Sequence, residues 1–195
     1  MARSKRQASP TSVYHWITRG INRKHLFHNR EDFQKFKELL LEYKAAHDIE
    51  IYHYCFMPNH VHLLLKAPTL ESMGKFSHFV LRKYTYYYCK VHGWAGSVFQ
   101  KGYKSLSVIK EAYLLECGRY IERNPIKAGL AQTPAQYPYS SYGFYASFLE
   151  DELITPSPVF LGLSDIPEER ARDYTEYVNQ DRIIDEMAGS EMLKT

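Results

Sequence analysis

The chain has 195 residues, of which 45% are hydrophobic and 15% aromatic, and its formal net charge at pH 7 is +3. This length suits one domain with an appendage, and the apolar content excludes a chain that is disordered throughout. The charge is uneven, because residues 1–150 hold 21 Lys and Arg against 11 Asp and Glu, whereas residues 151–195 hold 4 against 11. A basic, aromatic-rich body suits a nucleic-acid partner, although an ordinary mixed surface would also account for this charge.

The sequence carries no signal for secretion or for a membrane. The N-terminal stretch Met1–Arg6 is basic but lacks an apolar segment, and no apolar run approaches membrane-spanning length. The three cysteines, Cys55, Cys89 and Cys117, are widely spaced and form no Cys-x-x-Cys motif, so we expect reduced thiols. These features predict a cytoplasmic protein without a membrane partner.

The apolar pattern predicts alternating strands and helices along most of the chain. We expect strands over residues 12–19, 49–56, 60–66 and 97–108, and helices over 30–47, from Thr69 to about 90, and over 110–123. The last of these helices should end at Asn124-Pro125, because residues before proline avoid the helical conformation. Residues 134–148, rich in Pro, Tyr and Ser, should be irregular, and one further helix is expected near 167–180.

The first six elements follow the order strand, helix, strand, strand, helix, strand. This is the split βαβ arrangement of ferredoxin-like domains. We therefore predict an α+β fold, a ferredoxin-like antiparallel sheet with helices packed on one face, plus a short acidic C-terminal extension. Residues 1–150 would form the main domain and residues 151–195 the extension. The other face of the strand over 60–66 is then free for a site.

Residues 57–65, Met-Pro-Asn-His-Val-His-Leu-Leu-Leu, contain the most informative motif. His60 and His62 are two residues apart on a predicted strand, so both imidazoles project from the same face. The residues that alternate with them point into the core: Val61, Leu63 and Leu65. Two neutral nitrogen donors on a rigid strand can form half of a metal site. Two polar residues on a half-exposed face have the same spacing, which alone favours that simpler explanation.

The helix predicted over 110–123 places Glu116, Tyr120 and Asn124 on one face. If this face meets the two histidines, a phenol and an amide oxygen converge on them. The result is two nitrogen ligands, one oxygen ligand and a nucleophile. Because a tyrosine in such a position more often packs in the core, the pattern alone does not assign a function.

Several short motifs follow one another between residue 12 and about residue 145. They are Tyr14-His15, Thr18-Arg19-Gly20, Asn22-Arg23, Leu26-Phe27, Met57–Leu65, Phe99-Gln100, Tyr103-Lys104-Ser105, Tyr120-Ile121, Asn124–Leu130 and Tyr139–Tyr142. In this order the chain resembles the single-tyrosine transposases of the His-hydrophobe-His superfamily, above all the REP-associated transposases and their insertion-sequence relatives. Gly96-Ser97 and Lys101-Gly102 depart from the family pattern, which affects DNA contacts rather than the central chemistry.

The resemblance implies a role for each site residue. His60 and His62 would be catalytic residues and metal ligands, Asn124 the third metal ligand, and Tyr120 the catalytic nucleophile. The metal would be Mg²⁺ or Mn²⁺, although imidazole also accepts zinc. The Tyr120 phenolate would attack the scissile phosphate, form a covalent 5′-phosphotyrosine and release a 3′-OH. Tyrosine titrates near pH 10, so it needs activation; Glu116 is a candidate base, and a solvated or salt-bridged Glu116 is the alternative.

The implied substrate is single-stranded or hairpin DNA, with bases stacked on aromatic rings and cations along the backbone. The candidate phosphate contacts are Arg19, Arg23, Lys101, Lys104 and Arg123. No small-molecule cofactor is implied. Relatives include dimers in which one chain's tyrosine serves the other's histidines, so a homodimer stays open beside a monomer.

Two other functions are compatible with the sequence. One is a domesticated, non-cleaving nucleic-acid-binding protein of the same fold. The other is a metal-dependent phosphodiesterase that uses water in place of the tyrosine. The presence of all four site residues favours the cleaving transposase, because a binding protein has no need of them.

Overall fold

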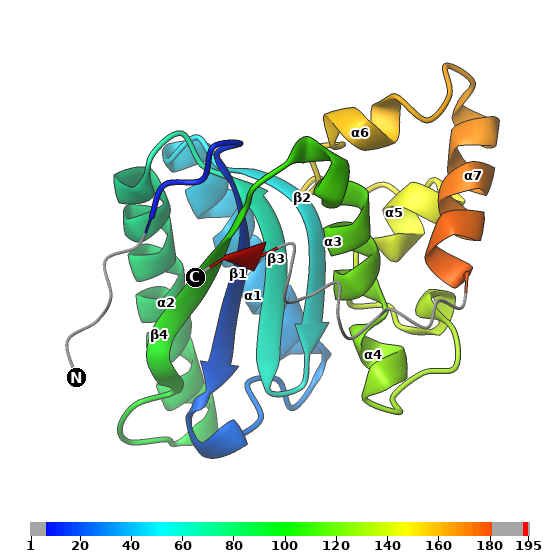
Figure 1. Ribbon diagram of the computed structural model, residues 1–195. Helices are drawn as coiled ribbons and strands as arrows, with labels where there is room; N and C mark the ends of the chain where they lie inside the picture. The colour runs from blue at the N-terminus through cyan, green and yellow to red at the C-terminus, as the bar shows by residue number, and fades with distance from the viewer. Residues whose placement is uncertain (1–6, 181–192, 195) are drawn as a thin grey trace.

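The fold is built on an antiparallel sheet, seen in a computed structural model that describes residues 7–180 and 193–194 (Figure 1). The strand order is β2-β3-β1-β4-β5. The strands are β1 (Val13–Gly20), β2 (Glu50–Met57), β3 (His60–Lys66), β4 (Phe99–Val108) and the short β5 (Leu193–Lys194). The first four confirm the predicted strands to within a residue or two at each end.

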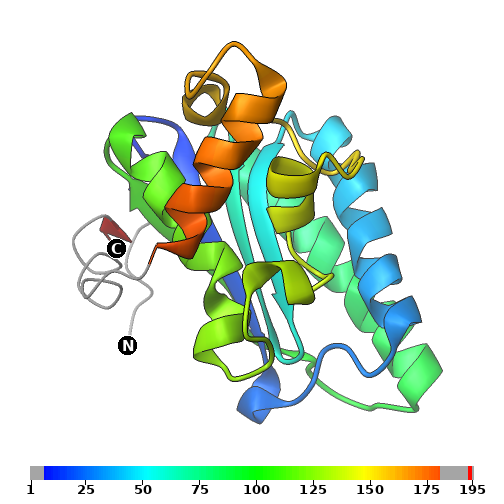
Figure 2. The same cartoon turned by 90° about the vertical axis from the view of Figure 1, so that its right-hand side faces the viewer.

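Helices lie on both faces of this sheet (Figure 2). One face is covered by α1 (Arg30–Ala46) and α2 (Leu70–His92), and the other by α3 (Leu114–Glu122). The remaining short helices are α4 (Asn124–Lys127), α5 (Tyr142–Ser147), α6 (Pro158–Leu161), α7 (Pro167–Asn179) and the 3₁₀ turns η1 (Ile21–Arg23), η2 (Glu111–Tyr113) and η3 (Pro134–Gln136). The ferredoxin-like pair of helices on one face is confirmed, and α3 adds a layer on the opposite face.

Side-chain caps define where the two long helices begin. The Asn29 side chain accepts a hydrogen bond from the Asp32 backbone N–H, and the Thr69 side chain accepts one from the Ser72 N–H. Such caps satisfy donors that have no partner inside the helix. Gly93 ends α2 in the left-handed conformation, which glycine adopts without steric cost.

Side chains on the two faces of β3 pack into two separate hydrophobic cores. Val61, Leu63 and Leu65 are fully buried against α1 and α2, as predicted. Leu64 points to the opposite face and packs with Leu114 and other residues of α3. Because successive side chains of a strand face opposite ways, the face that carries His60 and His62 is the face that α3 covers.

Two local predictions were wrong. Helix α3 begins only at Leu114, after the 3₁₀ turn η2, and not at residue 110 as predicted. Its predicted end before Pro125 is confirmed, since α3 ends at Glu122 and the chain turns helical again in α4 at Asn124. Pro125 causes this break because it occupies the first turn of α4, where a proline needs no N–H donor. The segment 134–148, predicted to be irregular, contains η3 and α5.

The C-terminal extension packs against the main body. Helix α7 confirms the helix predicted near 167–180 and buries Tyr174 and Val178 in the larger core. The Tyr174 hydroxyl donates to Glu122 Oε2 on α3 at 2.7 Å, and Lys44 on α1 donates to the Leu153 carbonyl. The division of the chain at residue 150 stays a prediction. Among the described residues, no helix is both long and apolar enough to cross a membrane.

Candidate functional site

The site begins with the two histidines of β3. His62 is 5% exposed and His60 is partly exposed, and their ring centroids lie 4.9 Å apart. Across the β1–β3 pair, His60 faces Arg19 and His62 faces Ile17. Both imidazoles therefore project from the same face of a fully paired strand, as the alternation predicted.

A neighbouring side chain fixes the protonation pattern of His60. The Asn59 amide nitrogen donates to the Arg23 carbonyl at 3.2 Å, so the Asn59 oxygen is the atom that lies 2.6 Å from His60 Nδ1. An amide oxygen only accepts hydrogen bonds, so Nδ1 of His60 carries the proton. The lone pair of neutral His60 is then on Nε2, where a metal ion could bind.

A third histidine belongs to this site. His15 on β1 is 2% exposed, its Nε2 lies 2.8 Å from His62 Nδ1, and the two rings are stacked at 5.0 Å. His15 was part of the Tyr14-His15 motif, but no role was predicted for it, because its contact with His62 depends on the register between β1 and β3.

Burial keeps these three imidazoles neutral. Loss of solvent, with the nearby Lys104 cation, lowers the pKa of His15 to about 3. Loss of solvent and the Arg19 cation lower the pKa of His60 to about 4, and burial holds the pKa of His62 well below 6.5. A neutral imidazole is the form that ligates a metal, so the site is suited to a cation at neutral pH.

Helix α3 brings Tyr120 to these histidines. The ring of Tyr120 meets the rings of His15 and His62 edge-on, at centroid distances of 5.8 and 6.3 Å. Gly118 allows this approach, because a Cβ atom there would lie 2.6 Å from the buried His53 ring on β2. The predicted meeting of the tyrosine face with the histidine face is therefore present within one chain.

Burial opposes ionisation of the tyrosine. Loss of solvent raises the pKa of Tyr120 above its ordinary value, with a smaller contribution from Cys117. The Lys127 ammonium lies 4.8 Å from the centre of the Tyr120 ring, a position that favours a negative phenolate. Lys127 was present in the Asn124–Leu130 motif but was not predicted to act on the tyrosine.

The contacts of Glu116 do not suit it to act as a base toward Tyr120. Its carboxylate forms an ion pair with Arg119 on the same helix and accepts a hydrogen bond from the Tyr177 hydroxyl of α7. This arrangement matches the salt-bridged alternative considered from the sequence.

Asn124 stands where α3 meets α4. Its amide nitrogen donates to the Tyr120 and Ile121 carbonyls at 2.7 and 3.2 Å, so Oδ1 is the atom that remains for a cation. Over the described residues, no three His, Cys, Asp or Glu side chains gather as a metal site. A metal ion here would therefore depend on two imidazoles, the Asn124 oxygen and oxygens of water or substrate, a set that fits Mg²⁺ or Mn²⁺.

The five predicted phosphate contacts are distributed unequally. Arg19 and Lys104 lie on the histidine face, opposite His60 and Ile17 in the sheet register. Arg23 and Lys101 are exposed and have left-handed backbone angles. Arg123 instead donates from Nη1 to the Val178 carbonyl of α7 at 3.0 Å.

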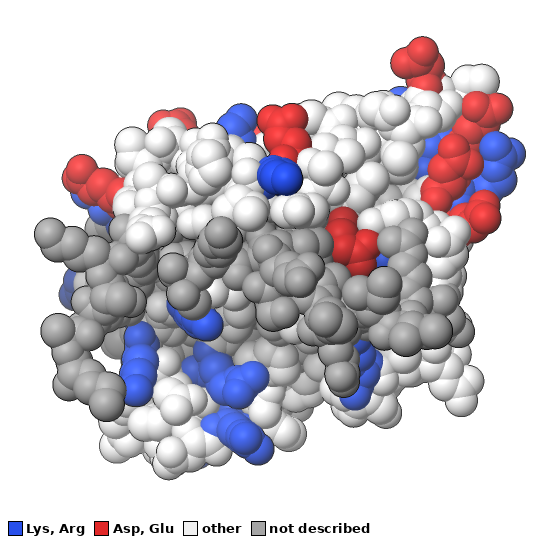
Figure 3. Space-filling model, in the orientation of Figure 1, with Lys and Arg blue, Asp and Glu red and all other residues white. Residues whose placement is uncertain are grey.

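Positive and negative charges occupy different parts of the histidine face. Figure 3 shows Lys and Arg gathered over its lower part, whereas Asp and Glu lie toward the top and over α7. This basic part lies at the lower edge of the sheet, where β1 ends and β4 begins (Figure 1).

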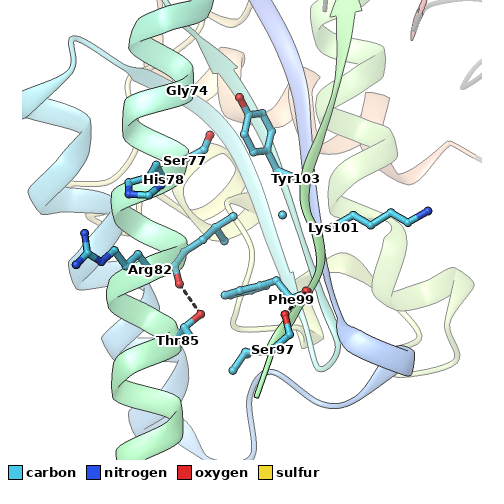
Figure 4. A pocket seen from close by; sticks show the side chains of 12 residues that line it. Gly74, Ser77, His78, Arg82, Thr85, Ser97, Phe99, Lys101 and Tyr103 are labelled. Carbon is cyan, nitrogen blue, oxygen red and sulfur yellow. Dashed lines mark hydrogen bonds between the residues drawn. The ribbon is translucent and has the colours of Figure 1, made fainter. Parts of the chain in front are cut away.

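One cavity among the described residues is a separate feature. It measures about 830 Å³ and lies between α2 and β4. Figure 4 shows Phe99 and Tyr103 directed toward α2, while Lys101 points to the other side of β4. Because α2 and α3 cover opposite faces of the sheet, this cavity is not part of the histidine–tyrosine site.

Comparisons with known proteins concern the fold and the family of the chain. A solved structure described as a REP-associated tyrosine transposase bound to a REP hairpin matches with a TM-score of 0.65 and 16% identity, over 80% of this chain and 93% of that one. A putative transposase from Deinococcus radiodurans R1 matches with a TM-score of only 0.43 and 23% identity, over 63% of this chain and 97% of that one. No curated protein matches the chain.

The first of these structures supports the fold, because it covers most of both chains. The family model described as "Transposase IS200 like" matches residues 9–124, which is more than half of the 195 residues. This range includes every residue of the histidine–tyrosine site except Lys127. The chain belongs to the IS200-like transposase family.

Proposed function

We propose that this protein cleaves and rejoins single-stranded DNA near hairpins, through a covalent 5′-phosphotyrosine on Tyr120 and with Mg²⁺ or Mn²⁺. The observation that carries the proposal is the position of Tyr120, whose ring contacts His62 and His15 on the strands that hold the candidate metal ligands. A nucleophile and a ligand pair on the same face can act on the same phosphate.

The chain supplies the nucleophile and the groups around it. When bound by His60, His62 and Asn124, the metal ion would polarise the scissile phosphate and offset charge in the in-line transition state. The Tyr120 oxygen attacks phosphorus while the bond to the 3′ oxygen breaks, so the 5′ phosphate is joined to tyrosine and a 3′-OH is released. Attack of a 3′-OH on the phosphotyrosine reverses the step and joins the strands, with the bond energy conserved.

Lys127 stabilises the nucleophile in this scheme. The pKa of Tyr120 is raised by burial, so the phenolate is costly at neutral pH without a nearby cation. The Lys127 ammonium above the ring lowers that cost. Glu116 is not assigned as the base, because its carboxylate is engaged by Arg119 and Tyr177, and the phenol proton passes to water.

The DNA path is proposed along the basic part of the histidine face. Arg19 and Lys104 project there beside the site, and Arg23 and Lys101 lie on the adjoining turns. Arg123 is the weakest of the five candidates, because its guanidinium holds α7. The REP hairpin bound to the fold relative described above favours hairpin DNA as the substrate.

A covalent-adduct assay tests this function. Labelled single-stranded DNA with a hairpin is mixed with wild type, Tyr120→Phe or His62→Ala, with and without Mg²⁺ or Mn²⁺, and resolved on a denaturing gel. Tyr113→Phe is the matched control, since Tyr113 packs against the same α3 core as Tyr120. We expect a metal-dependent protein–DNA band in wild type and in the control, and none in the two site variants.

The alternatives give different results in the same assay. A non-cleaving binding protein would retain the DNA on a native gel and form no adduct with any hairpin. A phosphodiesterase that uses water would release cut DNA without an adduct, and Tyr120→Phe would keep that activity.

A further inference from the structure

We propose that His15 is a positioning residue of this site: it accepts a hydrogen bond from Nδ1–H of His62 and so directs the Nε2 lone pair of His62 to the metal ion. This inference rests on the proposed metal-assisted function and assigns a role to a residue outside the His-x-His pair.

The geometry of the pair is that of a direct hydrogen bond. His15 Nε2 and His62 Nδ1 are 2.8 Å apart, within the range of strong N–H···N contacts, and the ring planes differ by 27°. Both side chains are almost completely buried, on adjacent strands β1 and β3. Water therefore cannot readily replace either partner, and rotation of the rings is restricted by packing.

Two neutral imidazoles can form this bond in two ways. If His62 donates from Nδ1, its Nε2 has a free lone pair and can bind a metal ion. If His15 donates from Nε2 instead, the proton of His62 is on its own Nε2, and that nitrogen cannot coordinate. The direction of this single hydrogen bond therefore decides whether His62 is a ligand.

The other ligand shows the same device in a fixed form. His60 donates from Nδ1 to the Asn59 oxygen, an acceptor only, and so has a single available tautomer. Metal-binding histidines commonly donate their second N–H to such an outer partner, which sets ring orientation and basicity. His15 occupies the corresponding place for His62.

One atom makes the His15 arrangement adjustable. In the ligand-competent tautomer, the proton of His15 is on Nδ1, which is buried and has no hydrogen-bond partner in the part of the chain that the structure describes. A buried, unsatisfied donor is unfavourable. In the other tautomer the same Nδ1 is a buried, unpaired acceptor, so each tautomer carries a cost and metal binding to Nε2 of His62 selects the competent one.

The test measures Mn²⁺ affinity by calorimetry on the full chain without DNA. His15→Leu removes the acceptor, whereas His15→Gln replaces it with an amide oxygen of similar reach. Leu106→Ala is the packing control, because Leu106 is the cross-strand neighbour of His15 on β4. We expect His15→Leu to weaken Mn²⁺ binding by about 10–100-fold, as removal of an outer partner does elsewhere, while His15→Gln and Leu106→Ala stay close to wild type.

The outcomes separate this inference from the proposed function. If His62→Ala abolishes Mn²⁺ binding and His15→Leu leaves it unchanged, the positioning role is overturned and the metal site stands. If wild type binds no Mn²⁺, both are overturned.

A second measurement uses the wild-type protein alone, so it does not depend on whether a variant folds. Nitrogen-15 NMR of the Mg²⁺-loaded wild type reports which ring nitrogen of His62 carries the proton. A proton on His62 Nδ1 together with an unprotonated Nε2 on His15 supports the role of His15, and a proton on Nε2 of His15 overturns it.

Discussion

Substitution of Gly118 by alanine should displace helix α3, which carries Tyr120. We expect this displacement to slow the chemistry more than it lowers the stability of the protein. An ideal Cβ at Gly118 lies 2.6–2.8 Å from three atoms of the His53 ring, whereas ordinary contact begins at 3.4 Å. The His53 ring cannot retreat freely, because it is stacked on Tyr145 at 4.4 Å and bonded to Glu122. Helix α3 must therefore move outward by roughly 0.8 Å, and overpacking of this kind costs about 1–3 kcal/mol.

The net loss of stability should be smaller than that cost. Alanine is favoured over glycine inside a helix by up to about 1 kcal/mol, so we expect the free energy of unfolding of Gly118→Ala to fall by about 2 kcal/mol or less. The effect on chemistry should be larger, because a shift near 1 Å at a reacting group can cost about 100-fold in rate. The expected result is a protein that folds and forms the Tyr120 adduct about 10–100-fold more slowly.

Gly74→Ala is the matched control for this experiment. Gly74 is also helical, in α2, but a Cβ there meets only the Tyr103 hydroxyl at 4.0 Å. It should gain stability and keep the wild-type adduct rate. Urea unfolding and the initial rate of adduct formation measure the two quantities. A Gly118→Ala protein with the wild-type adduct rate would refute the argument that this close approach places Tyr120.

Three further predictions concern the site itself. Lys127→Gln should slow adduct formation by about tenfold at pH 7 and less at higher pH, because the ammonium beside the ring favours the phenolate; an unchanged pH–rate profile would exclude this role. Tyr120 lies beside His62 of the same chain, so a mixture of Tyr120→Phe and His62→Ala should form no adduct, whereas recovery of the band would show exchange between chains. Burial lowers the pKa of His60 to about 4, from 6.5. The unfolded chain thus binds a proton that the folded protein does not, and the free energy of unfolding should fall as the pH drops from about 6.5 toward 4. In urea titrations His60→Asn should show a smaller fall over this range, and an equal fall would contradict the assignment.

The sequence was sufficient where a local period determines the result. The two-residue period of β3 placed His60 and His62 on one face and Val61, Leu63 and Leu65 on the other, and both assignments are confirmed. The helical period of the third helix placed Tyr120 and Asn124 on one side, and the motif order supplied the family, which the match over residues 9–124 confirms.

Contacts between distant strands were not accessible in this way. His15 bonds His62 across 47 residues, and only the β1–β3 register brings the two rings together. Lys127 reaches the Tyr120 ring because the chain turns at Pro125 and continues as α4. The sequence predicted the break at this proline, but it did not predict the direction that the chain takes after it. Local propensity carries no information on such geometry.

The role of the acidic extension also depended on tertiary contacts. Its net negative charge suggested a separate appendage, yet Tyr174 donates to the buried Glu122, which also accepts from Ser141. The Tyr177 and Val178 carbonyls at the end of α7 accept hydrogen bonds from Arg119 of α3 and from Arg123, which directly follows α3. Cations at a helix C-terminus are favourable, so α7 and α3 support each other in a way that a count of charges cannot show.

The most direct test of the account is the identity of the residue that becomes linked to DNA. The protein–DNA adduct formed with Mg²⁺ or Mn²⁺ would be digested with protease and nuclease, and the modified peptide sequenced by tandem mass spectrometry. We expect a 5′-phosphonucleotide on Tyr120, the tyrosine whose ring contacts His15 and His62. Attachment to any of the other tyrosines among the 17 in the chain would contradict it.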